Sequence, residues 1–278
     1  MKNILKIMLM MITIFTIAGS AVYAAEIPVS DQDQLITSSD WTEVSNLQDE
    51  MKKEEPDATI DYDKALKVYV DCNLIKLQTA DTKKLTSALE SANYVWVIPF
   101  KMEKTYGMFT VAKGLPLSEE AKSVLTKAEQ EEVKNHAGKW MITETAEHTV
   151  EPYYDILLEK REALSDCTRV VLVGSQPGMR QPVALGMDDE TARIWISLGY
   201  QYPVMEKIPE TQNGESGVYS FDSVAEISDT YIEDSEVSTG AGVQSRSSMK
   251  YVAGIGIIVI GSILILSVLK KKKLEDYE

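Results

Sequence analysis

Nineteen consecutive residues without a charge, Tyr251 to Leu269, most strongly constrain how this chain can fold. At about 1.5 Å of rise per residue, a helix of this length reaches about 28 Å, close to the thickness of a bilayer core. Four lysines follow at once, and they are Lys270, Lys271, Lys272 and Lys273. Positive charges beside a span stay in the cytoplasm, which predicts that these lysines act as a stop-transfer signal within a tail over 270–278. We therefore expect a single-pass protein of the cell membrane with its N-terminal part outside.

The N-terminus has the pattern of an export signal. Lys2 and Lys6 precede an almost wholly apolar run over 7–22, and Val22 and Ala24 place small residues at the −3 and −1 positions of a cleavage site. This predicts a signal peptide over 1–24. The alternative is an uncleaved anchor, which would leave residues 25–250 on the same side of the membrane.

The segment before the apolar run is rich in serine and glycine and predicts a stalk over 233–250. Covalent attachment by a sortase is an alternative to a retained span. That reaction uses an LPxTG motif, whereas this chain offers only Val237-Ser238-Thr239-Gly240. The sequence therefore favours a retained membrane anchor.

The part expected outside the membrane is strongly acidic. Without the two basic residues of the signal and the charges of the tail, 40 acids and 22 bases remain, a net charge of −18. Such a field repels nucleic acid and anionic polymers and improves solubility. We expect no nucleic-acid partner, and a protein or envelope ligand in its place.

The chain has two cysteines, Cys72 and Cys167. An even pair in an exported domain is compatible with a disulfide. Cys72 follows one predicted strand and Cys167 precedes another, so the two meet only if these strands are antiparallel and lie at opposite ends if they are parallel. The alternative is two buried free thiols.

Apolar runs and turn signals predict an α+β domain over 63–232, a mixed β-sheet with helices mainly on one face. Doubly wound α/β is the alternative. A flexible acidic arm is expected over 25–62, with one short helix over 41–53. Strands are predicted over 65–71, 93–100, 105–113, 139–150, 169–173, 182–187 and 192–198, and helices over 81–92, from Ser118 to Gly138, and over 152–164.

No residue pattern predicts catalysis or a cofactor. Gly174 to Gly178 lack the G-x-S-x-G spacing of a nucleophile elbow, and His136 and His148 have no nucleophile at motif spacing. The remaining candidates are two acidic clusters for a hard cation and four tyrosines for a sugar or peptide platform. They are Asp188-Asp189-Glu190, then Asp57 with Asp61 and Asp63, and lastly Tyr153, Tyr154, Tyr200 and Tyr202.

Three functions remain for a chain of this layout. The first is a membrane-anchored extracytoplasmic binding protein without catalysis. The second is an accessory subunit of a membrane complex. The third is an anchored envelope hydrolase that uses a carboxylate pair, for which Asp188, Asp189 and Glu190 are the compact candidates.

Overall fold

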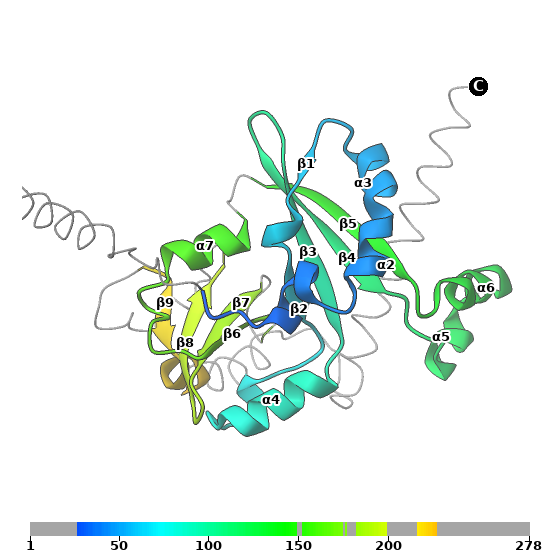
Figure 1. The fold of residues 1–278 in the computed structure, drawn as a ribbon. Coiled ribbons are helices and arrows are strands. Elements are labelled where there is room, and N and C mark those ends of the chain that lie inside the picture. Colours follow the sequence, from blue (N-terminus) through cyan, green and yellow to red (C-terminus); the bar gives the residue numbers. More distant parts are fainter. Residues whose placement is uncertain (1–26, 149–151, 175, 177–181, 199–215, 227–278) are drawn as a thin grey trace, which may run out of the picture.

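The computed structural model describes residues 27–148, 152–174, 176, 182–198 and 216–226 (Figure 1). The predicted signal peptide, stalk and apolar run lie outside these residues, as do Tyr200 and Tyr202. The stop-transfer signal lies outside them too, so the prediction for Lys270, Lys271, Lys272 and Lys273 stays a prediction from the sequence. No helix in the described part of the chain has the length and apolar character that crossing a membrane requires.

The described residues form an α+β fold around one mixed sheet (Figure 1). Its order is β5-β4-β3-β2-β6-β7-β8-β9, with β1 paired to β3 beyond the end of β2. Among these strands only β2 and β6 are parallel neighbours. The strands are β1 (Thr59–Ile60), β2 (Leu66–Tyr69), β3 (Tyr94–Lys101), β4 (Tyr106–Lys113), β5 (Trp140–His148), β6 (Arg169–Val173), β7 (Val183–Met187), β8 (Ala192–Ser197) and β9 (Val218–Ser220).

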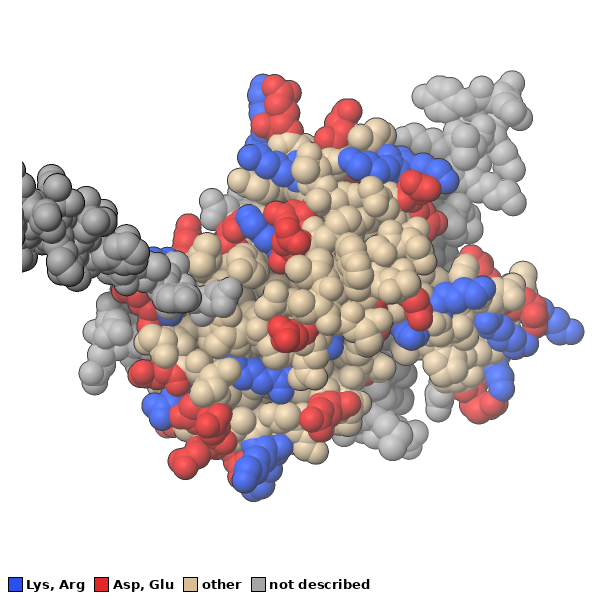
Figure 2. Space-filling model, in the orientation of Figure 1, with Lys and Arg blue, Asp and Glu red and all other residues tan. Residues whose placement is uncertain are grey.

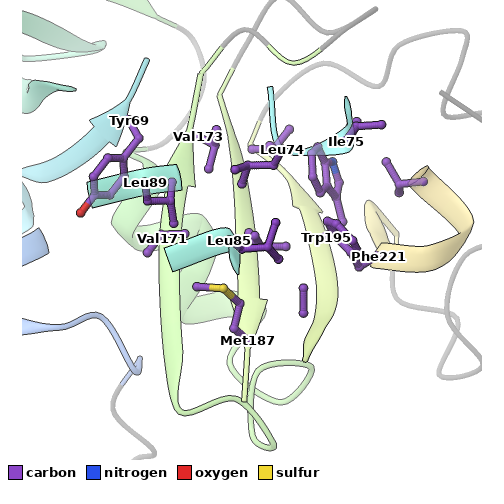
Figure 3. Close-up of a cluster of buried hydrophobic side chains, with 14 of the residues drawn as sticks. Tyr69, Leu74, Ile75, Leu85, Leu89, Val171, Val173, Met187, Trp195 and Phe221 are labelled. Carbon is purple, nitrogen blue, oxygen red and sulfur yellow. The ribbon is translucent and has the colours of Figure 1, made fainter. Parts of the chain in front are cut away.

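Helix α4 (Thr82–Ser91) covers one face of the β6–β8 half of the sheet. Asp81 caps it by accepting hydrogen bonds from the backbone N–H groups of Lys83 and Lys84, which the first turn leaves unpaired. Figure 3 shows Leu85 and Leu89 of this helix lying over the strand side chains. They pack in a cluster that contains Val171, Val173, Met187, Trp195 and Phe221.

Helix α7 (Tyr153–Glu159) lies on the opposite face. Successive strand residues point to opposite sides, and its Leu157 packs with Val170 and Leu172 rather than with their neighbours on β6. Ile27 and Val29 belong to the same buried cluster. The sheet therefore has helical cover on both faces.

The N-terminal segment is part of the domain core, which corrects the expected flexible arm over 25–62. Val29 forms a bridge with Val170, Gln34 forms one with Leu66, and the side chain of Leu35 is fully buried. The short helices η2 (Leu35–Thr37), α2 (Trp41–Val44), η3 (Ser45–Leu47) and α3 (Gln48–Glu54) cover the β3–β5 half of the sheet. Ahead of them, η1 (Asp31–Asp33) contacts β2 and β6 through Asp33. The predicted helix over 41–53 is confirmed as a run of three such pieces.

The helix expected from Ser118 to Gly138 is two helices. α5 (Glu119–Val124) ends before Thr126, which caps α6 (Lys127–His136) in a reciprocal pair of hydrogen bonds with Glu129. A capping box begins a new helix and so interrupts the apolar stripe. The two helices stand beyond the β4–β5 ladder, away from the sheet (Figure 1).

Candidate functional site

A buried carboxylate lies where the N-terminal segment meets the sheet. Asp33 is 2% exposed. It accepts hydrogen bonds from the Tyr69 hydroxyl at 2.8 Å, the Ser30 hydroxyl at 2.6 Å and the Arg169 guanidinium at 3.0 Å, and the Lys67 ammonium is 3.8 Å away. Its two oxygens are thus engaged inside the fold, which makes the group a poor candidate for contact with a substrate.

Lys67 of β2 lies among aromatic rings. Its Nζ is 4.5 Å from the centroid of Tyr94, 5.2 Å from that of Trp96 and 5.8 Å from that of Tyr69. Rings at these distances attract a cation through their quadrupoles. Burial lowers the pKa of Lys67 from its ordinary value, against the opposing pull of the neighbouring carboxylates.

Asp40 holds the other side of this arrangement. It accepts from the Tyr94 hydroxyl at 2.8 Å and from the Trp96 indole N–H at 3.1 Å. Burial first, and then the carboxylate each faces, raises the pKa of the Tyr69 and Tyr94 phenols. Both phenols are therefore protonated donors at neutral pH and hold the N-terminal segment on the sheet.

Sequence reasoning missed this cluster. Lys67 and Tyr69 are two residues apart on β2 and so point to the same face of the sheet, which the sequence could have predicted. Their partners Asp33 and Asp40 lie in a segment without strand or long-helix periodicity. The cluster's chemistry is structural, because each group that a reaction would use already has a partner within the fold.

The two cysteines are free thiols in the structure. Cys72 follows β2 and Cys167 precedes β6, and these strands are parallel, so the thiols lie at opposite ends of the pair. This arrangement excludes a bond between them and corrects the disulfide option. Burial raises the pKa of Cys72 to about 12 and that of Cys167 to about 11, which keeps both protonated and poorly nucleophilic.

A shallow cavity of about 400 Å³ lies beside Cys167. Asp166, Arg193 and Asp222 also line it. The Arg193 guanidinium donates to the Asp188 carboxylate, and the thiol is protonated. Among its described lining residues, the cavity therefore offers no activated thiol nucleophile.

The acidic triplet after β7 forms a hairpin turn instead of a cation site. Asp188 Oδ1 accepts from the backbone N–H groups of Glu190 at 2.8 Å and Thr191 at 2.6 Å, and these bonds lower the pKa of Asp188. Asp189 accepts from the Thr168 hydroxyl. Asp189 and Glu190 are exposed, so the hydrolase hypothesis loses its compact carboxylate cluster.

The other candidates are dispersed. Asp61 pairs with Lys64 at 3.8 Å, while Asp57 and Asp63 are exposed. Across the residues that the structure describes, no three His, Cys, Asp or Glu side chains are placed to hold a metal ion. Tyr153 and Tyr154 are half-buried against the α7 cluster, and His136 ends α6. Most of the turn over 174–178 lies outside the described residues.

One end of the sheet is open in a way that the sequence did not predict. β5 is the outermost strand and pairs with β4 alone among the described strands. Beside its first residue stands the α5–α6 hairpin, the segment over 115–137 that contains both helices. Its Leu115 and Val124 are 43% and 67% exposed. Figure 2 shows lysines and acids intermixed over this hairpin, at the right of the view.

β4 and β5 are antiparallel neighbours joined by a long insertion. A hairpin connection usually takes about two to five residues. Here residues 114–139 separate β4 from β5.

No family model, no curated protein and no solved structure matches this chain.

Proposed function

We propose that this chain is a membrane-anchored extracytoplasmic binding protein without catalysis, and that it recognises a protein partner through the open end of its sheet. The observation that carries the proposal is β5, a nine-residue strand with one free edge among the described residues. A strand edge presents unpaired main-chain donors and acceptors, which bind other chains. The carboxylate of Asp33 and the side chains of Tyr69, Lys67 and Arg169, by contrast, are engaged with one another in the fold.

The start of the folded core supports export. Ile27 and Val29 are 6% and 9% exposed and pack against the sheet. The cleavage proposed after Ala24 leaves Ala25 as the first residue, two positions before Ile27, the first buried side chain among the described residues. A mature chain that begins there needs no further trimming to fold.

The anchor proposed at Tyr251–Leu269 leaves 24 residues between Glu226, the last described residue, and the span. At about 5–6 Å × √n, a Ser/Gly-rich linker of this length averages about 25–30 Å. That reach lets the domain turn its open edge toward a partner on the same membrane. The four lysines after the span would hold the tail in the cytoplasm.

Protease treatment of spheroplasts that express the full chain tests the proposal. We expect a membrane-bound protein that begins at Ala25, and external protease should release a folded fragment without lysing the cell. The matched variant replaces Lys270, Lys271, Lys272 and Lys273 with glutamates and should lose the uniform orientation. A full-length protein protected from external protease until lysis would refute the proposed topology.

A further inference from the structure

The outer edge of β5 is long for an exposed strand. It has nine residues, against about five or six for a typical strand. All of its strand pairing goes to β4, from Tyr106 paired with His148 to Lys113 paired with Trp140. The outward-facing N–H and C=O groups of β5 therefore have no backbone partner in the described part of the chain.

A β-bulge divides this edge into two parts. Thr110 pairs with Glu144 and Val111 pairs with Ile142, so Thr143 is the extra residue. Its hydroxyl donates to the Thr110 carbonyl at 3.1 Å, which holds the bulge toward β4. Bulges twist an edge and limit indiscriminate pairing. Beyond the bulge, residues 144–148 keep a regular register and form the usable edge.

The acidic side chains of this edge lie in residues 144–148, beyond the bulge. Glu144 and Glu147 are exposed, and because they are three residues apart in the regular register beyond the bulge, they lie on opposite faces of the sheet. Glu54 of α3 reaches the same strand, where its carboxylate accepts from the Thr145 hydroxyl. β5 contains no lysine or arginine. An added strand would therefore meet carboxylates on both of its faces.

A second copy of this chain fits the edge poorly. Antiparallel self-pairing over 144–148 would bring Glu144 and Glu147 of both copies into one short ladder. Like charges across a strand pair are destabilising. Each expected extracytoplasmic part also has a net charge of −18, which opposes association.

We infer that residues 144–148 bind an extended segment of a partner protein with lysine or arginine side chains, which joins the sheet as an additional strand beside β5. This inference rests on the proposed function and names its partner. Main-chain hydrogen bonds would supply the affinity, and the carboxylates on the two faces would select a basic sequence. The half-buried Ile142, on the face covered by α2 and α3, offers an apolar contact next to the bulge.

The test measures the binding of a fluorescent seven-residue peptide, Lys-Val-Val-Lys-Val-Val-Lys, to the full-length protein in detergent, because lysines three residues apart point to opposite faces of a strand. We expect E144K/E147K to weaken binding at least tenfold. The matched variant E90K/E159K makes the same change in net charge at exposed positions on α4 and α7, and it should bind within twofold of the wild type. A peptide with alternate backbone amides N-methylated should bind at least tenfold more weakly, because it cannot complete the ladder.

Four results would overturn the inference, three from the binding measurements and one from light scattering. The first is no measurable binding of the lysine–valine peptide to the wild-type protein. The second is an equal loss in both charge variants, which would show attraction by net charge alone. The third is equal binding of the N-methylated peptide, which would show that no strand is added. Light scattering that finds a dimer dissociated by E144K/E147K would give the edge to a second copy and would also overturn it.

Failure of the inference is distinguishable from failure of the proposed function. The spheroplast experiment reads the topology and does not depend on β5. A correctly oriented protein that does not bind the peptide would refute the inference of a basic partner, while the proposal of a membrane-tethered domain would stand. A protein that binds the peptide but is not exposed outside the cell would support strand addition at β5 and would refute the proposed extracytoplasmic location.

Discussion

Asp33 links three parts of the fold that are far apart in the sequence. It lies on η1 and meets Tyr69 and Lys67 from β2 and Arg169 from β6. Removing one partner of a buried ion pair leaves the other charge uncompensated, which costs more than the pair itself contributes. The position therefore matters for stability more than its exposed acidic neighbours do.

We expect Asp33→Ala to lower the free energy of unfolding by about 3–5 kcal/mol, measured by urea denaturation. Asp31→Ala is the matched control on the same short helix, where the side chain is exposed, and should change it by less than about 0.5 kcal/mol. Similar losses in the two variants would contradict the buried network.

The raised pKa of Cys72 predicts an unusual pH dependence of alkylation. Only the thiolate reacts, and a thiol with a pKa of about 12 gains thiolate tenfold per pH unit well beyond pH 9. In a Cys167→Ala background, the iodoacetamide rate should rise without levelling from pH 7 to 10.5, with tryptophan fluorescence confirming the folded state. A plateau near pH 9 would show an ordinary, solvated thiol.

Two tyrosines and the two thiols determine how the free energy of unfolding changes at alkaline pH, and they are Tyr69, Tyr94, Cys72 and Cys167. Their folded pKa values lie above the unfolded ones, so the folded state holds these protons more tightly. That stabilisation is complete below the unfolded pKa values and is lost as the pH rises through the folded ones. Lys67, whose folded pKa is lowered, acts in the opposite direction. The free energy of unfolding should fall from about pH 9 upward. In the Tyr94→Phe variant it should fall less steeply with pH, because one of the raised phenol pKa values is gone.

At the scale of elements, burial separates helices that look alike in sequence. Leu89 of α4 is 1% exposed in the core, whereas Leu125 between α5 and α6 is half-buried. We expect Leu89→Ala to cost about 2–5 kcal/mol in unfolding free energy and Leu125→Ala less than about 1.5 kcal/mol. Equal costs would show that the α5–α6 hairpin belongs to the same cooperative core.

The α5–α6 hairpin should also be dispensable for the sheet. Gly114 and Gly138 already face each other, since the Gly138 N–H donates to the Gly114 carbonyl at 2.7 Å. Replacing residues 115–137 by Asn-Gly, a favoured two-residue turn, should leave the domain folded and peptide binding within threefold. Circular dichroism and the peptide titration measure both, and a collapse of β5 would contradict this division.

The strands were the most predictable elements, because continuous apolar runs such as 93–100 and 169–173 have few other ways to be buried. The direction of pairing was not predictable, and it decided the fate of the two cysteines. The helix from Ser118 was predicted as one piece because its apolar stripe passes through Thr126, where the capping box breaks it. β9 was missed because its three residues are too short for a period.

At the scale of the molecule, the sequence predicts a tether at the C-terminus, and the structure adds where the domain is open. The N-terminal segment was the largest error: composition predicted an arm, but Leu35, Val44 and Met51 are fully buried at irregular spacing. The open edge at β5 could not be predicted, because a strand is an edge only when no other strand pairs with its outer side, and that depends on the topology of the whole sheet. Neither composition nor periodicity reports that.

The central claim is that β5 is the binding edge of a membrane-tethered domain. Amide hydrogen exchange of the full-length protein, compared between its native membranes and detergent, tests it most directly. Residues 144–148 should exchange at least tenfold more slowly in the membranes, where a partner is present, while β9 at the opposite edge should not change. Identical exchange along β5 in both preparations would contradict the claim.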